Sequence, residues 1–204
     1  MALRASTLIF LIAAAALLAW MLSGREVASP PRMPASAALV DSPREVSQFV
    51  LQDSAGQPFT REQLIGRWSL LTIGFTHCPD VCPSTLAQLG KVTTAVENAG
   101  FRVQTIFVSV DPDRDTAQRL ADYTAYFNPR FVGLTGTKDE LDRLCGDLGF
   151  AYVRVPDKDG RYTVDHSTAV ALIDPQARVA AYFTQPLKPA AIAADLISLL
   201  AASR

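Results

Sequence analysis

The chain has 204 residues, of which 49% are hydrophobic and 19% charged, so it holds enough apolar material for one domain and an additional segment. Its 19 Lys and Arg residues are balanced by 20 Asp and Glu, which gives a formal net charge of −1. Nucleic-acid-binding domains carry a strongly basic surface, so this balance argues against nucleic acid as a partner.

The amino-terminal segment is apolar, and residues 5–24 contain no charged side chain. A helix of about 20 apolar residues crosses the hydrocarbon core of a bilayer, so we predict a transmembrane signal anchor over residues 1–24. The alternative is a cleaved secretory signal. However, the bulky residues Trp20, Met21 and Leu22 stand where a cleavage site needs small ones, and the small residues from Ser36 to Ala38 lie far downstream. No cysteine follows the run, which argues against a lipoprotein anchor.

Because the segment also acts as an export signal, we expect a short cytoplasmic tail and an exported domain. The charge bias that sets orientation is weak, with Arg4 before the segment and Arg25 and Arg32 after it. The predicted location is the bacterial inner membrane, crossed once, with the soluble domain in the periplasm. Residues 25–45 contain four prolines and little periodicity, so we predict a semi-extended linker there.

The remaining residues, 46–204, have the pattern of one folded domain. Apolar and β-branched runs predict strands at Phe49–Leu51, Trp68–Phe75, Val103–Val110, Phe131–Leu134, Thr168–Ile173 and Val179–Phe183. Helical periodicity predicts helices at Val81–Asn98, Asp115–Phe127, Lys138–Leu148 and Pro189–Ala202. This order predicts an α/β domain with a central mixed sheet flanked by helices, in a thioredoxin-like fold.

Two cysteines lie where the strand over residues 68–75 ends and the next helix begins. Cys78 and Cys82 are four residues apart, a spacing that places side chains on one helix face. A helix amino terminus stabilises a thiolate and lowers the pKa of a cysteine there. A purely structural disulfide is the alternative, but closing a loop of about five residues contributes only about 2 kcal/mol. The pattern therefore favours redox or metal chemistry.

A metal site needs at least one more ligand, and the chain has two histidines. His77 adjoins Cys78, and neighbours on an extended segment point to opposite sides. His166 precedes the predicted strand at residues 168–173, which in a thioredoxin-like fold lies beside the cysteine-bearing strand, so its loop faces the dithiol. Two thiolates and one imidazole suit Cu(I), and one further weak donor would allow Cu(II).

Zinc is the competing metal, but structural zinc normally takes four protein ligands. Cys145 is the remaining thiol, and it lies among apolar residues at helical spacing, which is typical of a buried core cysteine. Asp80, between the two site cysteines, is a candidate for supporting a ligand or contacting a partner.

Three segments together resemble the Sco/SenC family of copper-binding assembly factors for cytochrome c oxidase. They read GFTHCPDVCP at residues 74–83, VSVDPDRDT at residues 108–116 and VDHSTAVALIDP at residues 164–175, and they occur in the family's order. The resemblance covers the chain from about Glu45 to the carboxyl end. Within the second segment, we expect Asp111 and Asp115 to cap the next helix and form a turn rather than bind metal.

The resemblance implies a thioredoxin-like domain that holds copper through Cys78, Cys82 and His166. It further implies delivery of copper to the binuclear copper centre of oxidase subunit II, or reduction of that subunit's cysteines. Another periplasmic copper protein is an alternative client. Thioredoxins usually carry a cis-proline against the dithiol, whereas here residues 165–168 contain no proline and supply a histidine.

Other functions use the same residues. The dithiol suits a thiol–disulfide reductase, a thiol peroxidase or a redox sensor, and none of these requires His166. Copper binding requires reduced thiols, so we expect a Cys78–Cys82 disulfide to exclude the metal. Nothing in the sequence demands a dimer, and we expect a monomer.

Overall fold

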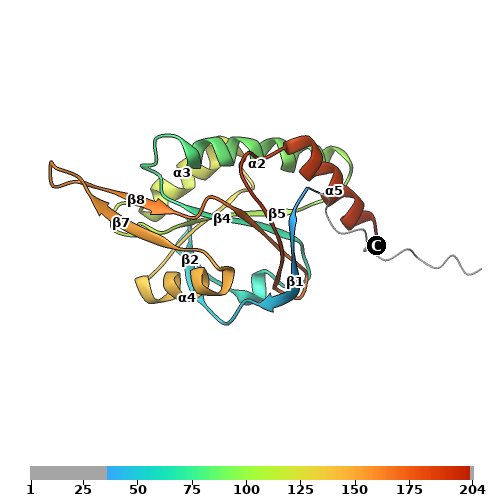
Figure 1. Cartoon of the computed structure of the whole chain (residues 1–204), viewed down its shortest axis with the longest axis horizontal. Coiled ribbons are helices and arrows are strands. Elements are labelled where there is room, and N and C mark those ends of the chain that lie inside the picture. Colours follow the sequence, from blue (N-terminus) through green and yellow to red (C-terminus); the bar gives the residue numbers. More distant parts are fainter. Residues whose placement is uncertain (1–35, 203–204) are drawn as a thin grey trace, which may run out of the picture. The chain divides into compact units, whose positions relative to one another are not determined.

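The computed structural model of the protein describes residues 36–202, which fold around one central sheet (Figure 1). The strands are β1 (Ala38–Glu45), β2 (Val50–Asp53), β3 (Pro58–Thr60), β4 (Ser69–Gly74), β5 (Gln104–Ser109), β6 (Val132–Thr135), β7 (Tyr152–Pro156), β8 (Tyr162–His166), β9 (Val170–Ile173) and β10 (Arg178–Phe183). The helices are the short 3-10 turn η1 (Arg61–Gln63) and α2 (Val81–Asn98), α3 (Ala117–Phe127), α4 (Lys138–Leu148) and α5 (Pro189–Ala202). Within residues 36–202 no helix is long and apolar enough to cross a membrane, and the predicted anchor lies outside this range.

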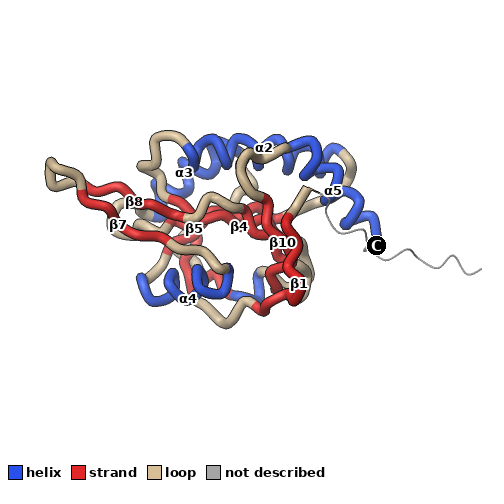
Figure 2. Tube along the Cα trace, viewed as in Figure 1, coloured by secondary structure: helices blue, strands red, loops and turns tan. Residues whose placement is uncertain are grey.

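The sheet has eight strands in the order β1-β10-β9-β4-β5-β6-β2-β3. The three central strands β4, β5 and β6 run parallel, and the neighbouring pairs are antiparallel. Every residue of β4 is buried, as expected for a strand covered on both faces. Figure 2 shows α2, α3 and α5 over one face of the sheet and α4 over the other. The predicted mixed α/β fold with helices flanking a central sheet is confirmed.

The elements that position the cysteines agree closely with the prediction. Helices α2, α4 and α5 have the predicted bounds, and β9 pairs antiparallel with β4. Helix α3 begins two residues later than expected, because Thr116 is its N-cap and accepts a hydrogen bond from the Arg119 amide at 3.3 Å.

The linker that we expected over residues 25–45 is wrong for residues 38–45, and residues 25–35 lie outside the described part of the chain. Residues 38–45 form β1, which pairs antiparallel with β10 at the edge of the sheet. A register shift interrupts the pairing between Leu39 and Arg44, and Pro43 lies inside this interruption. Edge strands and bulges accommodate proline, and the hydrogen-bond partner of β1 lies far away in the sequence. Local composition therefore gave no sign of this strand.

A two-stranded hairpin formed by β7 and β8 was not predicted. It pairs only within itself among the described strands, separate from the eight-stranded sheet (orange in Figure 1). Its turn is closed by a 2.8 Å hydrogen bond from the Asp157 amide to the Arg161 carbonyl, with Gly160 at φ 75°. Strand β8 ends at His166, so this histidine belongs to a strand rather than to the loop we expected.

Candidate metal centre

The two site cysteines lie on either side of the start of α2. Cys82 is the second residue of the helix and only 3% exposed, whereas Cys78 precedes the helix and is half-buried. The Cys82 amide donates a hydrogen bond of 3.5 Å to the Cys78 sulfur. The cysteines therefore do not share a helix face as predicted. Instead, a first-turn amide with no intrahelical acceptor points at the sulfur of Cys78.

Gly74, the last residue of β4, makes room for the Cys82 thiol. A Cβ atom at this position would lie 2.6 Å from the Cys82 sulfur and 2.8 Å from Cε2 of Phe107. Both distances are below any normal contact, so a larger residue would displace the thiol or the ring. The small residue before the cysteine segment is thus part of how the site is built.

His166 faces Cys82 across the site. Its Nε2 atom lies 3.2 Å from the Cys82 sulfur, and its Nδ1 atom lies 2.9 Å from the Ser167 carbonyl oxygen. A carbonyl can only accept, so Nδ1 carries the ring proton and its N–H donates a hydrogen bond to the Ser167 carbonyl. The lone pair of Nε2 is then directed at Cys82. The edge-to-face contact between Phe75 and the imidazole, with ring centroids 6.0 Å apart, further fixes the ring. This is the tautomer and orientation of a metal-ligating histidine.

One donor atom each from Cys78, Cys82 and His166 lies within 4.8 Å of the other two. The donor set of two sulfurs and one imidazole nitrogen suits soft Cu(I), so the residues present fit the metal that the sequence indicates. A cavity of about 390 Å³ opens beside Cys78 and His166, and the exposed residues Asp80 and Asp165 lie on its rim. The structure thus brings together all three residues that we predicted as ligands.

The electrostatics of Cys82 differ from our expectation. Burial raises the pKa of this thiol well above its ordinary value, and the neighbouring Cys78 adds to the rise. We had expected the helix amino terminus to lower the pKa. Desolvation outweighs the helix because the sulfur is enclosed by the core. A metal binding to Cys82 must therefore displace its proton.

The other candidate residues lie apart from this cluster. His77 points at Asp115, with Nδ1 at 3.5 Å from Oδ1, so it faces away from the thiols as predicted. Cys145 is 3% exposed in α4, and burial together with Asp142 raises its pKa to about 12. Asp80 is the N-cap of α2 but makes no side-chain capping bond. Among the described residues, none of the three joins Cys78, Cys82 and His166 in a metal-ligand group.

Asp111 and Asp115 are fully buried. The predicted turn is present, because the Asp111 carbonyl accepts hydrogen bonds from the Arg114 amide at 3.2 Å and the Asp115 amide at 3.0 Å. The predicted helix cap is wrong, because Thr116 is the N-cap of α3.

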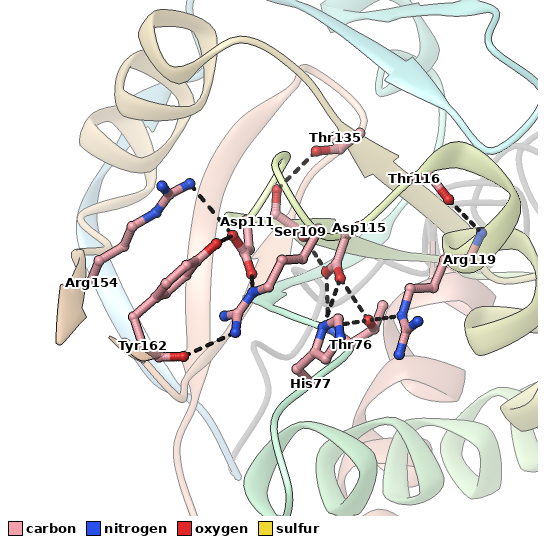
Figure 3. Close-up of polar contacts among 11 residues, drawn as sticks. Thr76, His77, Ser109, Asp111, Asp115, Thr116, Arg119, Thr135, Arg154 and Tyr162 are labelled. Atoms are coloured by element: carbon pink, nitrogen blue, oxygen red, sulfur yellow. Dashed lines mark hydrogen bonds and ion pairs between the residues drawn. The ribbon is translucent and has the colours of Figure 1, made fainter. Parts of the chain in front are cut away.

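The Asp115 carboxylate accepts hydrogen bonds from the Thr76 amide at 2.8 Å, the Thr76 hydroxyl at 2.6 Å and the Ser109 hydroxyl at 2.6 Å. Asp111 is paired with Arg114. Figure 3 shows its second ion pair, with Arg154. The sequence showed these acids in one motif between a strand and a helix, but it did not show their partners.

These two acids also lie near His77, with donor atoms of the three within 4.8 Å. This second group does not resemble an open metal site. Asp111 is already neutralised by two arginines, and Asp115 already accepts three hydrogen bonds. The network holds backbone segments together instead.

Comparison with known proteins gives consistent results. A family model described as SCO1/SenC matches residues 38–201. A protein of Stutzerimonas stutzeri described as copper-binding is 37% identical over 155 residues, covering 76% of each chain. The mitochondrial SCO1 homologue of Homo sapiens is 36% identical over 151 residues, which cover 72% of this chain and 50% of the human protein. The chain thus spans about half the length of this human relative.

Solved structures match as well. Copper-bound ScoI of Bradyrhizobium japonicum is 36% identical, with a TM-score of 0.69, and the match covers 74% of this chain and 97% of that one. Copper-bound ScoI of Arabidopsis thaliana is 31% identical, with a TM-score of 0.71, covering 76% and 97%. The three motifs at residues 74–83, 108–116 and 164–175 all lie inside residues 38–201, the region that the family model matches.

Proposed function

The chain belongs to the SCO1/SenC family, and we propose that it is a copper chaperone that binds one copper ion through Cys78, Cys82 and His166. The observation that carries this proposal is the convergence of three soft donors from two distant segments, with His166 Nε2 at 3.2 Å from the Cys82 sulfur. Copper-bound structures of similar proteins support copper as the metal.

The proposed client rests on the family, which is described as one of cytochrome c oxidase assembly proteins. We propose delivery of Cu(I) or Cu(II) to the binuclear copper centre of oxidase subunit II, with another periplasmic copper protein as the alternative client. The half-buried Cys78 and the open cavity beside it support transfer, because an incoming ligand can reach the metal from this side. The buried Cys82 then remains as the anchoring ligand.

A second function is favoured by one specific contact. The Cys82 amide donates a hydrogen bond to the sulfur of Cys78, the more accessible of the two cysteines. A thiolate there can attack a disulfide, and Cys82 can resolve the mixed disulfide, so the same dithiol suits a thiol–disulfide reductase acting on oxidase subunit cysteines. In this role His166 has no required part.

We propose that residues 1–24 anchor the protein in the bacterial inner membrane and hold the domain in the periplasm. Support comes from the charge-free run over residues 5–24, which is long enough to span a bilayer. Membrane fractionation and protease accessibility of the intact protein in spheroplasts test this placement. A domain protected from external protease contradicts it.

The chaperone proposal is tested by anaerobic Cu(I) titration of the reduced, full-length protein in detergent. We expect one tightly bound copper per chain, and affinity at least about 100-fold lower in Cys78→Ser and in Cys82→Ser. Cys145→Ser is the matched control, because this buried thiol lies outside the ligand group, and it should bind copper as the unaltered protein does. Tight binding that survives either site substitution contradicts the proposal and favours the reductase.

A further inference from the structure

The hairpin that carries His166 is not part of the main sheet. Strand β8 pairs with β7 and with no strand of the eight-stranded sheet, so no ladder of backbone hydrogen bonds joins the hairpin to that sheet, and side-chain contacts help to set how it lies against the rest of the fold. Alternate residues of a strand share one face, which puts Tyr162, Val164 and His166 on the same side of β8. Val164 is 3% exposed, so this side faces the body of the protein.

Arg114 and Asp111 hold Tyr162, at the other end of β8 from His166. The Tyr162 hydroxyl donates a 2.7 Å hydrogen bond to the Asp111 carboxylate, and Arg114 Nη1 donates a 2.9 Å hydrogen bond to the Tyr162 carbonyl. The Arg114 guanidinium also stacks on the Tyr162 ring, 3.8 Å from its centroid. Arg114 and Asp111 are themselves ion-paired, so Tyr162, Asp111 and Arg114 form one closed unit. Figure 3 shows the Tyr162 hydroxyl beside the Asp111 carboxylate.

A second contact joins this unit to β7. Arg154 lies 3.4 Å from the Asp111 carboxylate and 2.6 Å from that of Asp113. Both strands of the hairpin are thus bound to the segment that follows β5. Arg114 also lies 5.6 Å from the ring centroid of Phe75, which contacts the His166 imidazole.

The same segment holds the cysteine side of the site. Asp115 binds both the amide and the hydroxyl of Thr76, two residues before Cys78. The Ser109 hydroxyl connects the two acids, because it donates to Asp115 and accepts from the Asp111 amide. Residues 109–116 therefore touch both the cysteine segment and the hairpin that supplies His166.

From these contacts we infer that Asp111 and Arg114 are positioning residues for His166. They dock the hairpin on the segment after β5 and thereby hold the imidazole over the two cysteines. This inference rests on the proposed copper binding for its functional consequence. The positioning itself is a property of the metal-free protein and is measured without copper.

The geometry explains why this pair suits the task. Tyr162 and His166 are four residues apart on an extended strand, which is about 13 Å, so a small rotation of the hairpin at Tyr162 shifts the imidazole. Asp111 is fully buried, and its charge is tolerated only with a cation in contact. Arg114 supplies that charge, a directed hydrogen bond and a planar stacking surface, a combination that lysine lacks.

The test compares Arg114→Gln with Arg143→Gln in the full-length protein. Arg143 forms an ion pair with Glu140 at the same three-residue spacing, on the exposed surface of α4, and serves as a matched control. We expect Arg114→Gln to lower Cu(I) affinity about 10- to 100-fold, the usual effect of losing a group that orients a ligand. In the metal-free protein, the His166 Nδ1 proton bound to Ser167 should give an exchange-protected imidazole signal by NMR, and Arg114→Gln should abolish it.

Folded Arg114→Gln protein that retains both the affinity and the imidazole signal would overturn the inference, as would a loss of affinity with the signal unchanged. If Arg114→Gln does not fold, Tyr162→Phe replaces it, since this variant keeps the ring and removes only the hydrogen bond to Asp111. We expect about fivefold weaker copper binding and faster exchange of the imidazole proton, and no change in either overturns the inference. Unaltered protein that binds no copper contradicts the proposed function, while the imidazole signal still tests the positioning.

Discussion

His166 and Cys82 are 84 residues apart in the sequence, yet Nε2 of the histidine lies 3.2 Å from the sulfur of the cysteine. The contact joins the end of a separate hairpin to the first turn of α2, and the Ser167 carbonyl fixes the tautomer that leaves Nε2 free. The imidazole beside the two sulfurs distinguishes a candidate metal site from a site that holds only two thiols. It also makes the histidine the most informative position to change.

We expect His166→Ala to lower Cu(I) affinity at least about 100-fold, because loss of a ligand should exceed the effect of losing a ligand's supporting group. Disulfide exchange at Cys78 and Cys82 should remain close to its original rate. His77→Ala is the matched control, since this histidine adjoins Cys78 but faces Asp115. Competition with a Cu(I) chelator measures the affinity, and equal weakening by both substitutions argues against the three-ligand site.

A second prediction concerns the space beneath Cys82. Gly74→Ala places a methyl group 2.6 Å from the Cys82 sulfur, so we expect the free energy of unfolding to fall by about 1–3 kcal/mol and copper binding to weaken. Gly146→Ala in α4 meets nothing within 4 Å and should be stabilising by up to about 1 kcal/mol. Urea denaturation of both variants measures the difference. If Gly74→Ala changes neither the free energy of unfolding nor the copper affinity, the Cys82 thiol can move without affecting either.

The fold and the residues of the candidate site could largely be predicted from the sequence, for a physical reason. The buried strand β4 and the amphipathic helices carry their periodicity locally, and the candidate ligands belong to chemically distinctive types that are few in this chain. The same holds for the prediction that Cys145 packs in the core, which its 3% exposure confirms.

The features that were missed depend on partners distant in the sequence. Residues 38–45 form a strand because they pair with β10 through hydrogen bonds. The proline-rich composition of residues 25–45, which include Pro43, suggested a linker instead. The pKa of Cys82 depends on how deeply the helix start is buried, which no local pattern reveals. Asp111 is bound by Tyr162 across 51 residues, so its motif alone suggested only a turn.

A third prediction concerns oxidation. A Cys78–Cys82 disulfide removes both sulfur ligands, so fully oxidised protein should take up no copper until a reductant is added. The bridge closes a loop of about five residues and contributes about 2 kcal/mol, so the melting temperature of the oxidised protein should rise by about 4–8 °C. Copper content is measured by elemental analysis after gel filtration, with Cys145→Ser as control. Stoichiometric copper retained by oxidised protein excludes this redox gate.

A fourth prediction follows from the burial of Cys145. Its pKa is raised from 9.0 to about 12, so the unfolded thiol ionises first as the pH rises and the folded thiol stays protonated. The stabilising contribution is complete below pH 9.0 and is lost as the pH rises toward about 12. The difference in free energy of unfolding between the original protein and Cys145→Ala should therefore shrink by about 1 kcal/mol between pH 9 and pH 10. A difference that grows with pH contradicts this assignment.

The last prediction tests whether Asp115 and Thr76 act together in holding the cysteine segment. Asp115 is fully buried, and its two carboxylate oxygens accept from the amide and the hydroxyl of Thr76. Asp115→Asn replaces one of these acceptor oxygens by an NH2 donor, so it disrupts at least one of the hydrogen bonds and should cost about 1–3 kcal/mol of unfolding free energy. Thr76→Val removes only the hydroxyl and should cost about 1 kcal/mol.

If the two residues form one unit, the free energy of unfolding of the Asp115→Asn/Thr76→Val double variant falls by less than the sum of the two single decreases. The coupling energy should be about 0.5–3 kcal/mol. Thr124→Val serves as a control partner, because the hydroxyl of Thr124 bonds within its own helix, to the Leu120 carbonyl at 2.8 Å. Its effect should add to that of Asp115→Asn without coupling. Additivity in the Thr76 pair as well would mean that the Thr76 hydroxyl has no part in how Asp115 holds the cysteine segment, which would then rest on the Thr76 amide alone, and copper affinity would be unchanged in Thr76→Val.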